Sequence, residues 1–342
     1  MTPPFFPPHS THAPDGKFSH QTRGLEGKTI VDCSILLPGP FVAKLLALQG
    51  ARVIKIENPD RPDPARLMGA YYQDLNCMKE ERSIDITSSD GRKEFHEIIR
   101  ESHGLIEGFR PSTKAKLGLD ETTLHAINPQ LVIGSIIGFP ENGPWRDKAG
   151  HDLNFQATTG LLSLSHDMPP LPWADLFASY QAALSITSLL CAQSQGAKGQ
   201  RVTVSMSEAL IEIQSLLFAQ FQQDKKTPHH GGNLFSGAYP CYRIYNLSEN
   251  RRISVGCIEP KFWHRFCLTL GTSESELKEL LEGQFATGES GEKTVNKLQS
   301  ILSKRTWNEL GPQLEALDCC VEPIIDYREV TSNHLSTREN ET

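Results

Sequence analysis

A histidine and an aspartate stand side by side at the start of an apolar stretch, in the segment Gly150–Phe155. The imidazole of His151 exchanges protons near neutral pH, and the neighbouring carboxylate of Asp152 can fix its tautomer or favour its protonated form. The same pair is typical of a helix start, where it would serve only as a cap. Acid–base chemistry and capping both remain open from these residues alone.

A single carboxylate, Asp175, lies among apolar residues in the segment Trp173–Phe177. Burial raises the pKa of an aspartate and suits it to act as a base or a nucleophile. Asp175 is also placed to cap the helix predicted after it. Another carboxylate, Glu259, stands between a predicted strand and a predicted helix, and it indicates little by itself.

Elements that would position these side chains alternate along the first half of the chain. Short apolar runs predict strands, helical patterns lie between them, and such alternation is typical of a parallel sheet with helices on both faces. The sequence therefore predicts the α/β class. The predicted strands are 28–32, 52–57, 104–107, 131–135 and 202–206, and the main predicted helices are 42–48, 93–101, 176–193 and 208–222.

The composition changes to His, Gly, Asn and Pro over residues 228–237, which marks a linker. We expect a large α/β domain that binds its ligand (25–210), a linker (211–237) and a small α+β domain (238–318). Residues 319–342 are expected to return to the large domain. Residues 1–24 are rich in Pro and His without apolar periodicity, and we expect a disordered extension there.

Several function classes receive no support. A net charge of -7 gives no general attraction for nucleic acid or anionic membranes, and apolar runs such as 131–139 are too short for a bilayer span. The 8 cysteines form no C-x-x-C pair, which favours reduced thiols in a reducing compartment. His229 and His230 have no third ligand at a typical spacing, so no metal site is predicted. Neither a Walker loop nor a G-x-G-x-x-G loop is present.

Eight short motifs occur in a fixed order between residues 25 and 330. They are GPF after the first strand, VIKIE, EGFRPS with LGLD, INPQLV, GHDLNF, WADLF, KGQRVTVSM and VGCIEPKFW. In this order they resemble the class III CoA-transferase superfamily, which includes formyl-CoA transferase, carnitine CoA-transferase and 2-methylacyl-CoA racemase.

The resemblance implies an interlaced homodimer. Its active site would lie between the large domain of one subunit and the small domain of its partner. An acyl-CoA thioester would be the small-molecule substrate, with coenzyme A entering as part of it and no permanently bound cofactor. A cytoplasmic location is the default expectation.

The resemblance also implies catalytic roles. Asp175 matches the nucleophile of the transferases and the proton-transfer base of the racemases. His151 matches the racemase histidine, where transferases such as formyl-CoA transferase carry a tyrosine. Asp152 falls where both branches tend to hold an acid, and Glu259 matches a glutamate thought to orient the racemase histidine.

For coenzyme A, the resemblance implies that Gly39 and Pro40 approach the ligand. Lys79, Phe109 and Lys116 would lie near the nucleotide, with the lysines on phosphates and Phe109 against adenine. Solvated surface positions remain an alternative for both lysines.

Three functions remain open. The first is a racemase or epimerase of 2-methyl-branched acyl-CoA, which His151 favours. The second is a CoA transferase between carboxylic acids. The third is an inactive CoA-binding scaffold, suggested by departures from the family pattern, such as Leu176–Tyr180 in place of a glycine-rich stretch.

Overall fold

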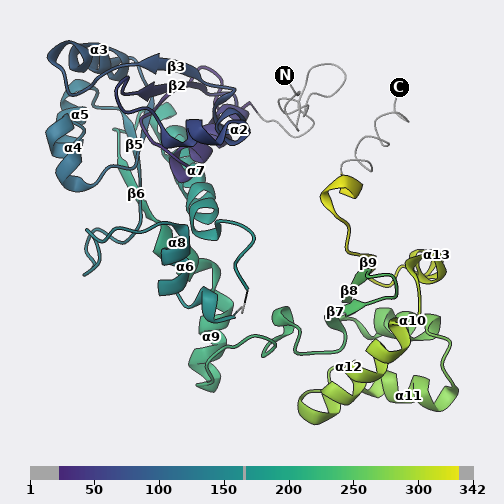
Figure 1. Cartoon of the computed structure of the whole chain (residues 1–342). Helices are drawn as coiled ribbons and strands as arrows, with labels where there is room; N and C mark the ends of the chain where they lie inside the picture. The colour runs from purple at the N-terminus through teal and green to yellow at the C-terminus, as the bar shows by residue number, and fades with distance from the viewer. Residues whose placement is uncertain (1–22, 165–166, 331–342) are drawn as a thin grey trace, which may run out of the picture. The chain divides into compact units, whose positions relative to one another are not determined.

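The computed structural model describes residues 23–164 and 167–330, and these form two compact units (Figure 1). Unit 1 holds the described residues of Met1–Leu162 and Asp167–Gln223, and unit 2 holds those of Ser163–His166 and Asp224–Thr342. The extension predicted for residues 1–24 lies almost wholly outside the described residues.

Unit 1 is built on a six-stranded sheet in the order β3-β2-β1-β4-β5-β6, and every pairing in it is parallel. Parallel neighbours need crossover connections, here mostly helical, and this confirms the predicted α/β class. The strands are β1 (Thr29–Asp32), β2 (Arg52–Glu57), β3 (Glu80–Ser83), β4 (Gly104–Glu107), β5 (Val132–Ile137) and β6 (Arg201–Ser205).

Separate hydrophobic clusters pack helices against the two faces of this sheet. One joins Leu46 and Ile186 to Ile106, and the other joins Phe95 and Leu124 to Leu105. The helices are α1 (Pro38–Leu48), η1 (Pro64–Met68), α2 (Ala70–Asn76), α3 (Ser89–Arg100), α4 (Pro111–Leu117), α5 (Glu121–Ile127), α6 (Asp152–Thr158), α7 (Trp173–Ser194), α8 (Met206–Ile213) and α9 (Ser215–Asp224).

Helix α7 approaches the sheet closely because small residues face it. Ala174, Ala178 and Ala182 are buried at a spacing of four residues, which places them on one side of the helix. On strand β5, a Cβ added to Gly134 would lie 2.4 Å from Cδ1 of Ile186. This close packing fixes the start of α7, and with it Asp175, against the sheet.

Two boundaries of unit 1 differ from those expected. Helix α7 begins at Trp173, directly after the N-cap residue Pro172, rather than at residue 176. Helices α8 and α9 continue to Asp224 through residues assigned to the linker, so unit 1 extends to Gln223 rather than to residue 210.

Unit 2 is a small α+β domain with a three-stranded antiparallel sheet in the order β7-β8-β9. Its core joins Tyr245 and Ile253 of the sheet to Trp263, Leu298 and Leu310 of the helices. The elements are η3 (Leu234–Ser236), β7 (Tyr242–Asn246), β8 (Arg252–Gly256), α10 (Pro260–Thr269), α11 (Glu274–Glu282), α12 (Gly288–Leu302), α13 (Trp307–Leu317) and β9 (Val321–Pro323).

Strand β9 belongs to unit 2, although residues 319–342 were expected to return to the large domain. It pairs with β8, and Val321 is buried in the core of this unit, which explains why the segment stays there. Residues 331–342 of the expected return lie outside the described residues.

The 8 cysteines, all within the described ranges, are free thiols, and Cys33, Cys241, Cys257, Cys267 and Cys319 are buried. A search of the described helices finds none with the length and apolar character needed to cross a bilayer.

Candidate functional site

A cavity opens at the carboxyl edge of the sheet in unit 1, where β1 and β4 are neighbours and the strand order reverses. Loops that follow such strands diverge toward opposite faces, and the crevice between them is where open α/β sheets bind ligands. The cavity holds about 410 Å³ and is lined by the loops after β1, β4 and β5, by the segment before α6, and by Asp175.

Asp175 is the third residue of α7, and Pro172 stands at the N-cap, so the alternative role of Asp175 as N-cap is wrong. Burial raises the pKa of the Asp175 carboxyl to about 7, and the nearby Asp152 carboxylate adds to this rise. A carboxyl group with such a pKa exchanges protons readily at neutral pH.

Asp152 begins α6 but stabilises the start of another helix. One of its oxygens accepts the backbone N–H of Ala174 at 2.7 Å and that of Asp175 at 3.3 Å. The other accepts the Nε2–H of the buried Gln156 at 2.5 Å. The carboxylate thus caps α7 across the helix contact and adds negative charge beside Asp175.

His151 directly precedes α6 and is exposed, and its backbone N–H donates to Oδ1 of Asn154 at 3.0 Å. It lines the same cavity as Asp175. The structure therefore brings together two of the predicted catalytic residues, which are 24 positions apart in the chain (175 minus 151).

Glu259 belongs to unit 2, where it is exposed and directly precedes α10.

Among the residues expected near coenzyme A, Gly39 and Phe109 line the cavity. Gly39 lies in the first turn of α1, where an added Cβ would come within 2.2 Å of the Ser34 side chain. Phe109 is half-buried, and its N–H donates to Oε2 of Glu107 at 2.8 Å. Pro40 is buried beside Gly39 in α1.

Lys79 differs from the expected phosphate contact. Its side chain has no exposed surface, and its ammonium donates to Asp32, to the carbonyl of Pro40 and to Asn76, at 2.9, 2.9 and 2.8 Å. These bonds use all three ammonium donors. Lys79 therefore links Pro40 of α1 to Asp32 at the end of β1, inside unit 1. Lys116 on α4 is exposed, as a phosphate contact or a surface charge requires.

Buried charged residues at the strand ends were not predicted. Lys55 of β2 bonds Asp63 at 3.1 Å, and Lys114 bonds Glu107 of β4 at 3.1 Å. Ser135 of β5 also donates to Glu107. In the sequence, a charged residue next to apolar strand residues could have indicated these pairs, since a buried charge needs a partner.

Arg110, which belongs to the EGFRPS motif, lines the cavity. Arg146 and Lys148 also line it, although no motif marked them, and the Lys148 ammonium lies 4.8 Å from the ring centroid of Trp145. Burial raises the pKa of the Tyr71 phenol on α2, and the Asp175 carboxylate adds to this rise.

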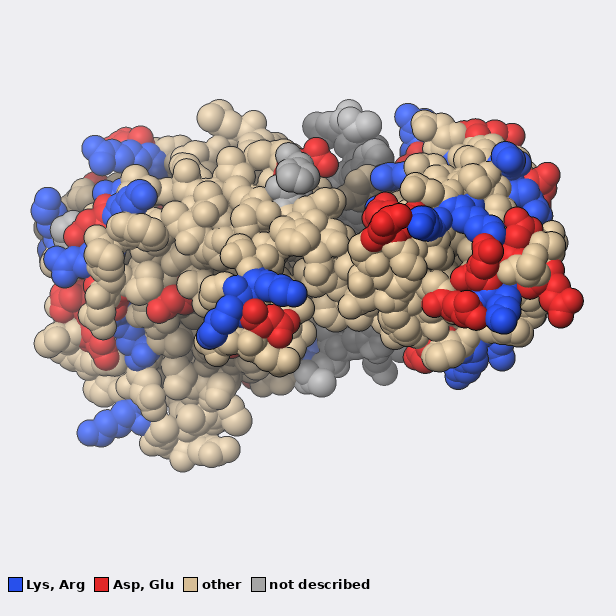
Figure 2. Space-filling view, turned by 90° about the horizontal axis from the view of Figure 1, so that it is seen from below, with Lys and Arg blue, Asp and Glu red and all other residues tan. Residues whose placement is uncertain are grey.

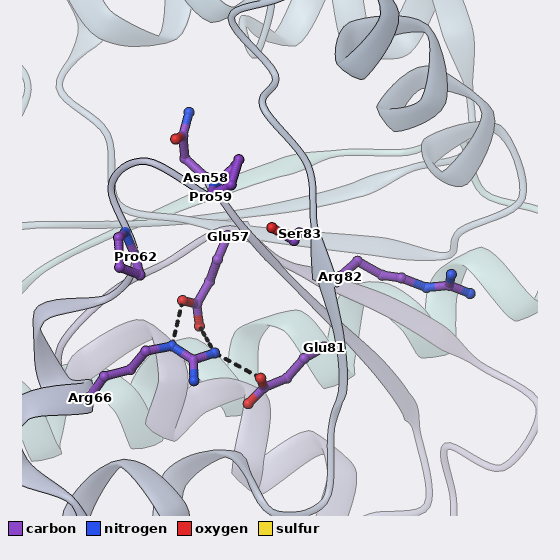
Figure 3. A pocket seen from close by; sticks show the side chains of 8 residues that line it. All are labelled: Glu57, Asn58, Pro59, Pro62, Arg66, Glu81, Arg82 and Ser83. Atoms are coloured by element: carbon purple, nitrogen blue, oxygen red, sulfur yellow. Dashed lines mark hydrogen bonds and ion pairs between the residues drawn. The ribbon is translucent and has the colours of Figure 1, made fainter.

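A second, polar cavity of about 360 Å³ lies beside the carboxyl ends of β2 and β3 (Figure 3). The Arg66 guanidinium bonds Glu57 at 2.9 Å and Glu81 at 2.7 Å, so one cation holds two carboxylates. Arg82 points away from this group in Figure 3.

Comparisons with known proteins agree with this architecture. The chain is 28% identical to human alpha-methylacyl-CoA racemase, over 90% of the chain and 79% of that protein. It is 30% identical to a Caenorhabditis elegans CaiB/baiF CoA-transferase family protein, over 91% of the chain and 88% of the relative. It is 30% identical to the succinate–glutarate CoA-transferase of Agrobacterium fabrum, over 83% of the chain and 75% of that protein.

A solved structure, a CAIB/BAIF family protein from Brucella suis, has the same fold with a TM-score of 0.77. It is 24% identical and covers 90% of this chain and 85% of its own. The family model of CoA-transferase family III matches residues 25–342. The resemblance seen in the motifs is thereby confirmed, and the chain belongs to the enzymes of CoA-transferase family III.

Proposed function

We propose that this enzyme is a racemase or epimerase of 2-methyl-branched acyl-CoA thioesters that works by two-base proton transfer. The observation that carries the proposal is the carboxyl group of Asp175, whose pKa is about 7 and which shares one cavity with His151. Inversion at the α-carbon needs one acid or base on each face of a planar intermediate. Asp175 and His151 supply these two groups.

In the proposed reaction the C–H bond beside the thioester carbonyl breaks, and its proton passes to Asp175. The electron pair forms an enolate, and the protonated imidazole of His151 returns a proton to the opposite face. In the reverse direction the two groups exchange roles. Formation of the enolate is uphill, because a proton beside a thioester carbonyl is only weakly acidic. An Asp175 carboxyl with a pKa of about 7 is populated both as base and as acid at neutral pH, so it can accept this proton in one direction and return it in the other.

The cavity lining supports the binding of coenzyme A. Arg110 and Lys148 line the cavity, and Lys116 is exposed on α4, after the same strand as Arg110. Cations of this kind stabilise bound phosphates. Phe109 offers an aromatic surface for adenine, and Gly39 permits close approach of a ligand to the backbone of α1.

A second candidate function is CoA transfer between carboxylic acids, which the similarity to a succinate–glutarate CoA-transferase favours. The Asp175 carboxylate would attack the thioester and release CoA thiolate, leaving a mixed anhydride. The thiolate would then attack the aspartyl carbonyl and expel the first carboxylate. Two further exchanges of the same kind would move CoA to the acceptor acid, so this reaction requires a second carboxylic acid.

Proton exchange at the α-carbon of a 2-methylacyl-CoA in deuterated water, without added acid, tests the proposal. We expect deuterium uptake with loss of optical purity in the wild type. The Asp175→Asn variant should not racemise, because His151 alone can exchange a proton on one face only. Wild-type protein that binds CoA, takes up no deuterium and converts acyl-CoA only with an added acid would be a transferase. Binding without either reaction would indicate the inactive scaffold.

A further inference from the structure

The loop between β1 and α1 forms one wall of the cavity that contains Asp175, through Ser34, Ile35, Leu36 and Pro38. Leu36 has a φ of +63°, in the left-handed region that residues with a Cβ rarely adopt. Such a conformation persists only where the surroundings hold it. The loop therefore depends on its anchors.

Asp63 is the central anchor, and its side chain has no exposed surface. One carboxylate oxygen accepts the backbone N–H of Leu36 at 3.0 Å and that of Ala65 at 2.9 Å. The other accepts the Lys55 ammonium at 3.1 Å, and Lys55 also donates to the carbonyl of Ser34 at 2.9 Å. Asp63 and Lys55 thus hold the loop on both sides of Ile35.

The anchor is itself fixed. The backbone N–H of Asp63 donates to Oε2 of Glu57 at 3.1 Å, and Arg66 holds the same carboxylate in the second cavity, as Figure 3 shows. Replacing a buried ion pair by a hydrophobic pair of equal volume often leaves the stability of a protein unchanged or increases it. Such a pair would leave the N–H of Leu36 and the carbonyl of Ser34 without partners. Lys55 and Asp63 therefore hold this loop in a way that an apolar pair could not.

We infer that Asp63, acting with Lys55, is a positioning residue for the proposed reaction at Asp175. By fixing Ser34 and Leu36 it sets the cavity wall that orients the acyl thioester toward the Asp175 carboxyl. This inference rests on the proposed function. A thioester displaced by about 1 Å from its reacting group commonly loses about 10²-fold in rate, so an anchor of this wall affects turnover.

Two double variants test the inference, because either single change would leave a buried charge without its partner. Lys55→Met/Asp63→Leu removes both holds on the loop. Lys55→Met/Asp63→Asn keeps an acceptor for the N–H of Leu36 and loses only the hold on Ser34. The matched control is Glu80→Gln, which breaks an exposed ion pair with Arg52 at the opposite end of β2.

We expect the leucine variant to lose at least about tenfold in kcat for deuterium exchange, or for CoA transfer if that is the wild-type reaction. The asparagine variant should lose less, about threefold. Both should bind free CoA with a Kd within about twofold of the wild type, because free CoA carries no acyl group to orient. Leu36→Gly in the leucine variant should recover part of the lost kcat, since glycine adopts a positive φ without an anchor.

Wild-type kcat in either folded double variant overturns the inference, and the asparagine variant decides alone if the leucine variant does not fold. A parallel loss of kcat, CoA binding and Tm, without recovery by Leu36→Gly, also overturns it and leaves a purely structural pair. A wild type that performs neither exchange nor transfer refutes the proposed function instead, before any variant is made.

Discussion

The pKa of Asp175 has two causes, and the structure ranks them. Burial at the start of α7 is the larger, and the charge of Asp152 is the smaller. A pKa of about 7 leaves the group near half ionised at neutral pH, so both the base and its conjugate acid are populated. The same burial that raises the pKa of Asp175 also means that ionisation of this carboxyl destabilises the folded state.

The Asp175→Asn variant should therefore be inactive yet more stable at alkaline pH. Because the folded-state pKa lies above the ordinary value of 3.8, the folded protein binds this proton more tightly than the unfolded chain. Ionisation destabilises the fold as the pH rises from about 4 to 7, and the whole penalty is present at pH 8. Removing it should add on the order of 2 to 4 kcal/mol to the free energy of unfolding.

Urea unfolding at pH 8 and at pH 4 measures this difference. The gain should be near zero at pH 4, where the carboxyl of the wild type is already protonated in the folded state. An equal gain at both pH values, or a loss at pH 8, would show that the carboxyl is not the buried proton carrier described above.

The His151→Ala variant separates the two bases. With Asp175 alone, a proton can leave and return on one face only, so racemisation should fall by at least about 10²-fold. Deuterium uptake should persist for the one enantiomer whose α-proton faces Asp175. Stereospecific exchange followed by mass spectrometry and chiral analysis measures both. Undiminished racemisation, or equal residual exchange of both enantiomers, would contradict the division of roles.

Whole elements were predictable where burial and local sequence agree. The predicted bounds 52–57 and 104–107 coincide with β2 and β4, because apolar and charged residues alternate in β2 and the apolar pair of β4 lies between Gly104 and Glu107. Strand β3 has the sequence EERS, all of it exposed, and pairs only with β2 at the sheet edge. No apolar pattern marks such a strand, so it was missed.

The site was predictable only in part for a related reason. The motifs named Asp175 and His151, whereas the bonds of Asp152 to α7 join residues 22 and 23 positions apart. Lys79 likewise bonds three protein groups instead of facing solvent, and this depends on the packing of α1 against α2. Contacts of this kind belong to tertiary structure, and no local pattern encodes them.

At the scale of elements, a change at Asp152 tests the contact between α6 and α7. Asp152→Asn keeps an acceptor for the N–H groups of α7 but removes the charge, so the pKa of Asp175 should fall while remaining above 3.8 because burial persists. The acidic limb of the pH–rate profile should therefore move to lower pH. Asp152→Ala should show the same shift and lose about 1 kcal/mol of stability with the cap.

Asp120→Asn, at the N-cap of α5, is the matched control. The Asp120 carboxylate accepts the N–H of Thr123 at 3.0 Å, and Asp120 does not line the cavity. This variant should leave the pH–rate profile in place. An alkaline shift in Asp152→Asn, or no shift, would mean that Asp152 does not act on the charge of Asp175.

At the scale of the whole molecule, helix α9 exposes its apolar side chains within the described part of the chain. No residue of α9 is buried, and Leu216, Phe218 and Phe221 are 70%, 40% and 39% exposed. Helix α9 carries no charged side chain before Asp224. Figure 2 shows a largely tan face of unit 1 with a small group of blue and red side chains near its centre. Exposed apolar surface with few charges is typical of an interface.

We propose a second copy of the chain as the partner of α9, because the family resemblance implies an interlaced dimer. Light scattering should then give twice the mass of one chain for the wild type. Leu216→Glu should give the mass of one chain, since a buried glutamate without a partner opposes association. The same change on an exposed position should alter the stability of a monomer by no more than about 0.5 kcal/mol.

Turnover should fall together with the dimer if the site combines Asp175 of one subunit with the region of Glu259 from its partner. Activity of Leu216→Glu should then rise more than linearly with protein concentration, as mass action recovers the dimer. Lys278→Glu on α11, where the wild-type side chain is 78% exposed, should change neither mass nor turnover. A wild-type chain that is monomeric at micromolar concentration and fully active would place the whole site within one subunit.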